Sequence, residues 1–215
     1  MTNGVDLRLG LSMRVMEMTE YVEIRDVLAH DWSAYLKTVL LDAHWIPVPN
    51  IGKDVCDFIE FWELNGFILT GGNNINEVQL RDETEWIILE YAIKKKLPVF
   101  GICRGMQMIC HYCNLNPFPC PNPQTHIASN HSIKLINNFL QWYGDELMVN
   151  SFHSQCVGMV DSFTGRLIPF AIACDGLVEG VIDVERKLCG IMWHPERKNP
   201  ASKFDNYLIQ SFFSR

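Results

Sequence analysis

The stretch that decides the fold is LPVFGICRGM, from Leu97 to Met106. Its first six residues carry no charge and are typical of a buried strand, whereas Arg104 to Tyr112 has helical character. Strand and helix are therefore separated by a single residue, Cys103. Gly101 and Gly105 lie on either side of it and leave room for a sharp turn. The stretch predicts a strand–turn–helix unit within a parallel α/β sheet.

The rest of the chain continues this alternation. In the first half we expect strands at Leu7–Val15, Trp45–Val48 and Gly66–Thr70, and helices at Asp31–Asp42 (with Asp31 as N-cap), Val55–Leu64 and Asp82–Lys96. The second half predicts strands at Ser132–Leu135, Leu147–Asn150, Leu167–Cys174, Leu177–Val184 and Leu188–Trp193, a closing helix at Ala201–Phe213, and a loop with four prolines at Asn114–Asn130. We expect one domain over residues 1–215. Its fold is a flavodoxin-like, doubly wound, mostly parallel sheet with helices on both faces and added antiparallel strands.

Composition excludes several classes of protein. The chain has 215 residues, 48% of them hydrophobic and 20% charged, with a formal net charge of −7. No basic field for nucleic acid is present, and no apolar run is long enough to span a membrane. No signal peptide is visible, so we expect a cytoplasmic protein. Its eight cysteines are then expected to be reduced thiols.

Cys103 is the candidate nucleophile. A single residue in a tight strand-to-helix turn has the geometry of a nucleophile elbow. The helix N-terminus also favours the thiolate, which is the reactive form of cysteine. The alternative is a buried structural cysteine.

His194, Pro195 and Glu196 follow the last predicted strand. In extended backbone, residues i and i+2 point to one side. His194 would take the proton from Cys103, and Glu196 would orient the imidazole. A histidine satisfied at a strand end beside a surface glutamate is the alternative.

Four segments together resemble the class I glutamine amidotransferases, and in particular the related γ-glutamyl hydrolases of the peptidase C26 type. They are LTGG (Leu69–Gly72), GICRGMQ (Gly101–Gln107), VNSFHSQ (Val149–Gln155) and WHPE (Trp193–Glu196), in the order of that family. The resemblance implies a cysteine-dependent hydrolase of γ-glutamyl amides that needs no cofactor. Thr70 stands where the family commonly has a proline, which leaves the leaving-group side open.

The resemblance also implies roles at matching positions. The N–H groups of Gly72 and Arg104 should form the oxyanion hole. Gln107 should contact the γ-glutamyl group, and Ser151 and Phe152 should bind its α-amino and α-carboxylate ends, largely through their backbone. His153 belongs to the expected substrate-binding residues as well. The alternatives are a solvated helix residue for Gln107 and ordinary loop packing for Ser151 and Phe152.

The leaving group is the open question. Length and the cysteine-rich helix also resemble the hydrolases of γ-glutamyl-CDP-amidate in capsule synthesis. Arg25 and Arg197 could meet the phosphates of such a substrate, although Arg25 could equally pair with Glu23 or Asp26 in solvent. Three alternatives remain: a glutaminase subunit with a separate synthetase partner, a non-hydrolytic stress or chaperone-like protein, and a protease of longer peptides. A homodimer is also left open.

A set of cysteines and histidines suggests zinc at first sight: Cys110, His111, Cys113, Cys120, His126 and His131. The spacing of Cys110 and Cys113 suits half a zinc site, but no second pair of that spacing follows. We therefore expect no metal.

Overall fold

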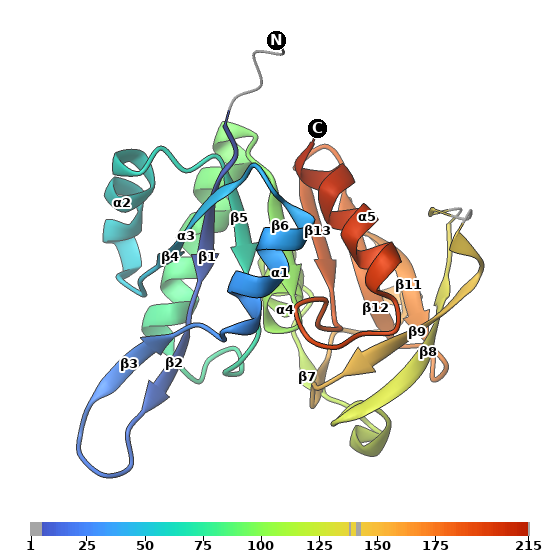
Figure 1. Cartoon of the computed structure of the whole chain (residues 1–215). Helices are drawn as coiled ribbons and strands as arrows, with labels where there is room; N and C mark the ends of the chain where they lie inside the picture. Colours follow the sequence, from blue (N-terminus) through green and yellow to red (C-terminus); the bar gives the residue numbers. More distant parts are fainter. Residues whose placement is uncertain (1–5, 138, 141–142, 215) are drawn as a thin grey trace.

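Figure 1 shows the computed structural model, which describes residues 6–137, 139–140 and 143–214. Within these residues a nine-stranded sheet runs in the order β4-β1-β5-β6-β13-β12-β11-β8-β9. Five neighbouring strands are parallel: β4 (His44–Val48), β1 (Arg8–Ser12), β5 (Gly66–Leu69), β6 (Val99–Ile102) and β13 (Leu188–Ile191). The next four are each antiparallel to the strand before: β12 (Val178–Asp183), β11 (Ile168–Ala173), β8 (Ser129–Leu135) and β9 (Glu146–Ser151). The predicted fold class is confirmed.

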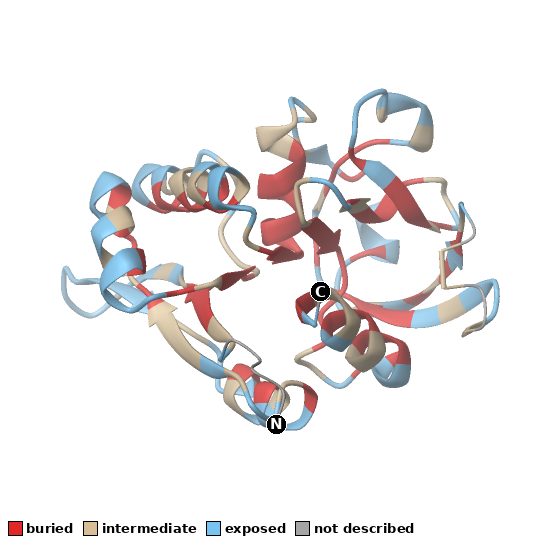
Figure 2. Ribbon diagram, turned by 90° about the horizontal axis from the view of Figure 1, so that it is seen from above, coloured by how far each residue is buried: buried red, intermediate tan, exposed pale blue. Residues whose placement is uncertain are grey.

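Helices cover both faces of this sheet (Figure 1). On one face lie α1 (Asp31–Val39) and α5 (Ser202–Phe213), whose Trp32 and Phe204 belong to one apolar cluster. The other face carries α2 (Val55–Phe61), α3 (Gln79–Lys95) and α4 (Arg104–Tyr112), whose Leu89 and Met106 belong to a second cluster. Figure 2 shows the central strands and α4 mostly buried, with exposed residues on the outer sides of the helices. Burial on both faces explains the uncharged strands around β6.

Several predicted boundaries move. The strand predicted from Leu7 breaks at Met13, and the chain continues as β2 (Arg14–Glu17), which forms a hairpin with β3 (Ile24–Val27). Helix α1 begins at Asp31 itself, so the prediction of Asp31 as N-cap was wrong; the cap is His30 and has no side-chain hydrogen bond. Short 3₁₀ turns occur at η1 (Gly52–Asp54), η2 (Pro123–Thr125) and η4 (Val160–Ser162).

The expectation that every cysteine is a free thiol was also wrong. Cys120 and Cys156 form a disulfide, with Cα atoms 5.2 Å apart. The pairing of β7 (Phe118–Pro119) with β10 (Gln155–Cys156) brings them together, and the Cys120 N–H donates to the Ser154 carbonyl at 2.9 Å. The sequence could not reveal this because the two cysteines are 36 positions apart. Separately, none of the described helices is both long and apolar enough to cross a membrane.

Candidate active site

The carboxyl ends of four parallel strands bring together the residues singled out from the sequence. Cys103 follows β6, His194 lies three residues after β13, and Gly71 and Gly72 follow β5. β1 leads into Arg14 at the start of the hairpin strand β2. Because these strands are parallel and adjacent, their ends meet at one edge of the sheet, where α/β folds commonly place their sites.

Cys103 lies in a strained turn. Its φ is 53° and its ψ is −108°, a conformation that non-glycine residues rarely adopt. Close packing holds it there: a Cβ added to Gly105 would lie 2.0 Å from the Leu69 carbonyl oxygen, and one added to Gly101 would lie 2.5 Å from the Gly105 backbone. The Cys103 N–H donates to the Ile191 carbonyl at 2.8 Å, which ties the turn to β13. This is the elbow expected from the sequence.

The side chain of Asn150 holds the backbone of His194 in place. Its N–H donates to Asn150 Oδ1 and its carbonyl accepts from Asn150 Nδ2, both at 2.8 Å. Its Nδ1 lies 2.7 Å from Glu196 Oε1. The contact arises from a turn, in which the Arg197 N–H donates to the His194 carbonyl at 3.3 Å, and not from the extended backbone that we expected. The hydrogen bond to Glu196 leaves Nε2 as the nitrogen available to the thiol.

Gly71 lies between the thiol and the imidazole. A Cβ added there would be 3.5 Å from Cys103 Cβ, 2.8 Å from His194 Cε1 and 3.7 Å from His194 Nε2. Glycine at this position therefore allows Cys103 and His194 to approach each other across the β5 loop.

The two groups shift each other's ionisation. Burial raises the pKa of the Cys103 thiol, but the charge of His194 and its hydrogen bond to the sulfur outweigh burial and bring the pKa below its ordinary value. Burial lowers the pKa of His194, while the Cys103 thiolate and the Glu196 carboxylate together raise it to about 9. Between the two pKa values the pair exists as thiolate and imidazolium, which combines a nucleophile with a proton donor.

Arg81, on α3, fixes the loop after β5 and was missed from the sequence. Its guanidinium is fully buried and donates to the carbonyls of Thr70, Gly71 and Gly72 at 2.8, 3.1 and 2.9 Å. Because a trans peptide directs its C=O and N–H to opposite sides, the bond to the Gly71 carbonyl turns the Gly72 N–H away from Arg81. Glu85 pairs with the guanidinium at 3.1 Å.

Arg104 offers its N–H rather than its side chain. The guanidinium is buried and pairs with Glu85 and Asp82. Its N–H belongs to the first turn of α4, where backbone donors have no acceptor within the helix. The Gly72 N–H is thus oriented by the hydrogen bond of Arg81 to the Gly71 carbonyl and the Arg104 N–H by the start of α4, an arrangement able to stabilise an oxyanion.

Two adjoining hollows flank Cys103, with volumes of about 260 and about 180 Å³. Both are lined by Arg14, Gly72, Cys103 and Phe152. The larger adds, among others, Arg104, Gln107, His153, Ser154 and Gln155. The smaller adds, among others, Gly71, His194, Glu196 and Arg197. A substrate can therefore extend to either side of the sulfur.

Of the other residues expected to bind substrate, Gln107 and Arg197 line a hollow, whereas Ser151 does not. Gln107 donates to the Gln155 carbonyl at 3.3 Å, and the Arg197 guanidinium lies 4.5 Å from the centre of the Phe152 ring. Ser151 is fully buried, and its hydroxyl donates to the His126 carbonyl at 2.7 Å, so its side chain does not face either hollow.

Arg25 lies outside both hollows. It is exposed on the β2–β3 hairpin and pairs with Glu23, as the alternative predicted. Arg14, and not Arg25, is the arginine from the β2–β3 hairpin that lines both hollows. The sequence concealed Arg14 because we counted it within the first strand.

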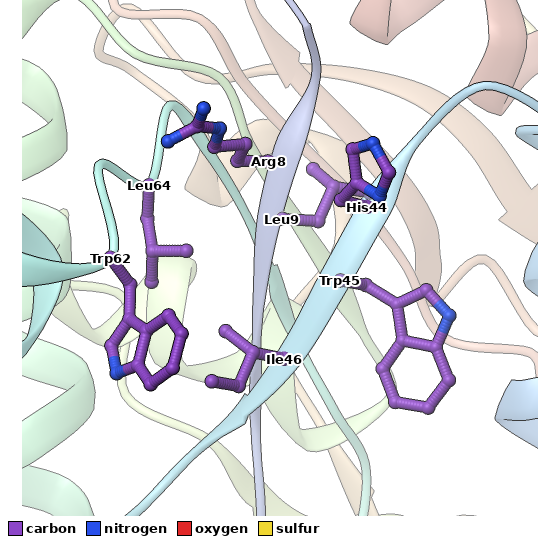
Figure 3. A pocket seen from close by; sticks show the side chains of 7 residues that line it. All are labelled: Arg8, Leu9, His44, Trp45, Ile46, Trp62 and Leu64. Carbon is purple, nitrogen blue, oxygen red and sulfur yellow. The ribbon is translucent and has the colours of Figure 1, made fainter.

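A further hollow, of about 420 Å³, lies at the opposite end of the sheet (Figure 3). Its lining includes Arg8 and Leu9 at the start of β1, His44 and Trp45 at the start of β4, and Trp62 before β5. These are the amino ends of the parallel strands. The hollow contains no cysteine, so it offers no counterpart to the elbow.

Comparisons with known proteins show the family of the chain. The γ-glutamyl-CDP-amidate hydrolase of Campylobacter jejuni is 29% identical over 213 residues, with 96% of this chain and 97% of the relative covered. The γ-glutamyl-γ-aminobutyrate hydrolase of Escherichia coli is 25% identical over 154 residues, covering 62% of this chain and 59% of the relative. The fold is similar to the crystal structure of a glutamine amidotransferase from Thermotoga maritima (TM-score 0.64, 14% identity, 96% of this chain and 82% of that chain covered). The peptidase C26 family model matches residues 20–196. The chain therefore belongs to the peptidase C26 family, whose members are enzymes of the glutamine amidotransferase and γ-glutamyl hydrolase type.

Proposed function

We propose that the chain hydrolyses a γ-glutamyl amide through a glutamyl thioester on Cys103. The observation that carries this proposal is the strained elbow of Cys103 beside an imidazole that Glu196 orients at 2.7 Å. The thiolate attacks the γ-carbonyl carbon, and the oxyanion is stabilised by the N–H groups of Gly72 and Arg104. As the C–N bond breaks, His194 gives its proton to the leaving nitrogen. Neutral His194 then takes a proton from water, which attacks the thioester and releases glutamate and the free thiol.

We assign the larger hollow to the glutamyl part. Gln107, Phe152 and His153 line it. The smaller hollow would then hold the leaving group, where Arg14 and Arg197 supply positive charge in a chain of net charge −7. An anionic leaving group suits these cations, since guanidinium pairs well with phosphate. The relative from Campylobacter jejuni supports γ-glutamyl-CDP-amidate as the substrate.

The test is a panel of substrates with glutamate release as the readout. Glutamine, γ-glutamyl-γ-aminobutyrate and γ-glutamyl-CDP-amidate are compared for the wild type and Cys103→Ala. We expect the wild type to release glutamate and Cys103→Ala to release none. Glutamate release that persists in Cys103→Ala would remove the cysteine mechanism, whereas a wild type that releases no glutamate from any of these substrates would favour the non-hydrolytic, chaperone-like alternative. Turnover of α-linked peptides would favour a protease instead.

A second set of variants tests the leaving group. Arg14→Ala and Arg197→Ala should reduce turnover of the nucleotide substrate at least tenfold more than turnover of glutamine. Arg25→Ala is the matched control, because that arginine is exposed and paired on the hairpin. Equal losses on both substrates would reject the nucleotide. Glutamine turnover that depends on a co-purifying chain would instead favour a glutaminase subunit with a synthetase partner. A homodimer, a cytoplasmic location and a single domain over residues 1–215 stay predictions.

A further inference from the structure

Behind the larger hollow, four buried side chains face one another with polar atoms that have no hydrogen-bond partner. The atoms are His126 Nδ1, both ring nitrogens of His131, His153 Nε2 and both carboxylate oxygens of Glu179. The four residues are between 0% and 8% exposed. They account for six of the eleven unpaired buried side-chain atoms in the described part of the chain. Because buried polar groups are nearly always paired, such a concentration requires an explanation.

The distances do not suit a hydrogen-bonded network. The carboxylate of Glu179 lies 3.3 Å from His153 Nε2, 3.5 Å from His126 Nδ1 and 3.7 Å from His131 Nε2. A charge-assisted hydrogen bond would be about 2.7–2.9 Å long. Two ligands bound tetrahedrally to one zinc ion, each at about 2.0–2.1 Å, are in contrast about 3.3 Å apart. The distances from Glu179 to the three imidazoles are thus close to those between donors around a common ion, and the ligand atoms of His126, His131 and Glu179 all lie within 4.8 Å of one another.

The outer nitrogens of two imidazoles are held as metal sites require. His126 Nε2 lies 2.9 Å from Asp175 Oδ2, and His153 Nδ1 lies 3.1 Å from the Gln155 carbonyl. Each outer N–H therefore has an acceptor outside the cluster, which leaves the inner nitrogen with a free lone pair. Ligating histidines are commonly fixed in this way by a carboxylate or a carbonyl.

We propose that His126, His131, His153 and Glu179 form a four-ligand site for a divalent transition-metal ion, with zinc as the ion that the donors fit best. Three imidazoles exclude magnesium and calcium, which take oxygen ligands. Four protein ligands in a buried setting form a closed set, which is typical of a structural site.

Such a site would connect segments that are distant in sequence. His126 follows η2, His131 lies on β8, His153 follows β9 and Glu179 lies on β12. The ion would anchor the proline-rich segment to the antiparallel half of the sheet. It would also fix His153, which lines the larger hollow beside Cys103.

A second group of donors, Cys120, Cys156 and His153, lies nearby with all ligand atoms within 4.8 Å of one another. The two sulfurs form a disulfide, so neither can act as a thiolate ligand. This group is therefore the natural control for the site.

The experiment measures metal in the purified full-length chain. The protein is stripped with a chelator, reloaded with zinc chloride, freed of excess by gel filtration and analysed by mass spectrometry for metals. We expect about one zinc per chain in the wild type. His131→Ala and Glu179→Gln should lose at least nine-tenths of it, and neither residue lines the hollows at Cys103. His111→Ala and the double variant Cys120→Ser/Cys156→Ser should keep the zinc.

A readout on the unaltered chain guards against variants that do not fold. Histidine ring nitrogens of the stripped, ¹⁵N-labelled wild type should change shift for three of the seven histidines on addition of zinc. Cobalt in place of zinc should give the visible absorption of a tetrahedral site. A wild type that retains no zinc after reloading, or zinc that survives in folded Glu179→Gln, would overturn the proposal. Zinc lost only in the double cysteine variant would assign it to the cysteines instead. These results do not depend on turnover, so they stand apart from the test of the proposed reaction.

Discussion

Glu196→Gln separates the proposed catalytic pair from a merely structural histidine. Glutamine keeps the size of the side chain and an oxygen that can accept from His194 Nδ1, but it removes the negative charge 2.7 Å from the ring. That charge helps to raise the pKa of His194 to about 9. Without it the imidazolium is less stable. The Cys103 thiolate, whose pKa is lowered mainly by His194, loses part of its support.

The size of the effect follows from the hydrogen bond. A bond to a charged partner contributes about 1.5–3 kcal/mol and a neutral one about 0.5–1.5, so the substitution costs roughly 1–2 kcal/mol. Since one pKa unit corresponds to about 1.4 kcal/mol, the pKa of His194 should fall by about one unit. The rate requires thiolate and imidazolium together. Its alkaline limb should move down from about 9 to about 8, and its acid limb should move up because the pKa of Cys103 rises. The pH profile narrows from both sides, and kcat falls by roughly 5–30-fold, the rate equivalent of 1–2 kcal/mol.

Two assays check this result. Glutamate release against pH gives both limbs of kcat/KM, and alkylation by iodoacetamide against pH follows the Cys103 thiolate without substrate. Glu185→Gln is the control, because that glutamate is exposed and pairs with Arg166 at the surface. Limbs that stay in place in folded Glu196→Gln, or an alkylation profile like that of the wild type, would refute the thiolate–imidazolium pair.

Three further predictions concern the frame of the site. Gly105→Ala should destabilise the fold by about 3 kcal/mol or more, because the added Cβ would lie 2.0 Å from the Leu69 carbonyl. Urea unfolding measures this loss of stability, and a midpoint like that of the wild type would contradict the close packing at Gly105. Arg81→Met should lower kcat roughly 10²-fold with a smaller change in KM, since it frees the loop that carries an oxyanion donor; a loss confined to KM would assign Arg81 to binding instead. Reduction of the Cys120–Cys156 disulfide should lower the free energy of unfolding by about 4 kcal/mol through loop entropy, which is measured as a lower unfolding midpoint in the presence of reductant. If reductant lowers the midpoint equally in a variant with both cysteines replaced by serine, the disulfide is not the cause.

The elbow could be predicted from the sequence because its determinants are local. An uncharged strand, a glycine on each side and a helical continuation all fall within ten residues of Cys103. Helix α4 has the bounds that we expected. His194 and Glu196 were also placed together, although by a turn rather than a strand, because residues two apart in sequence are close in either conformation.

Arg81 could not be predicted, because its partners come from elsewhere in the chain. We expected α3 to start at Asp82, and a charged residue just before a helix is normally solvated. The helix starts at Gln79, which turns Arg81 inward toward the carbonyls of the β5 loop. The disulfide and the histidine cluster could not be predicted either, because their members also come from distant parts of the chain. The residues weighed for zinc in the sequence included His126 and His131 but not His153 and Glu179, which come from the segment after β9 and from β12 and for which the local pattern gives no signal.

The change of strand direction at β13 explains why catalytic and cluster residues share one edge. β13 is parallel to β6, so His194 leaves the sheet at the end where Cys103 does. It is antiparallel to β12, so the amino end of β12 lies at that same edge. The Met192 N–H accordingly donates to the Glu179 carbonyl at 2.8 Å. A purely parallel sheet would put only carboxyl ends there. The antiparallel strands add an amino end that carries Glu179, and the proposed metal can therefore support the wall of the larger hollow without occupying the elbow.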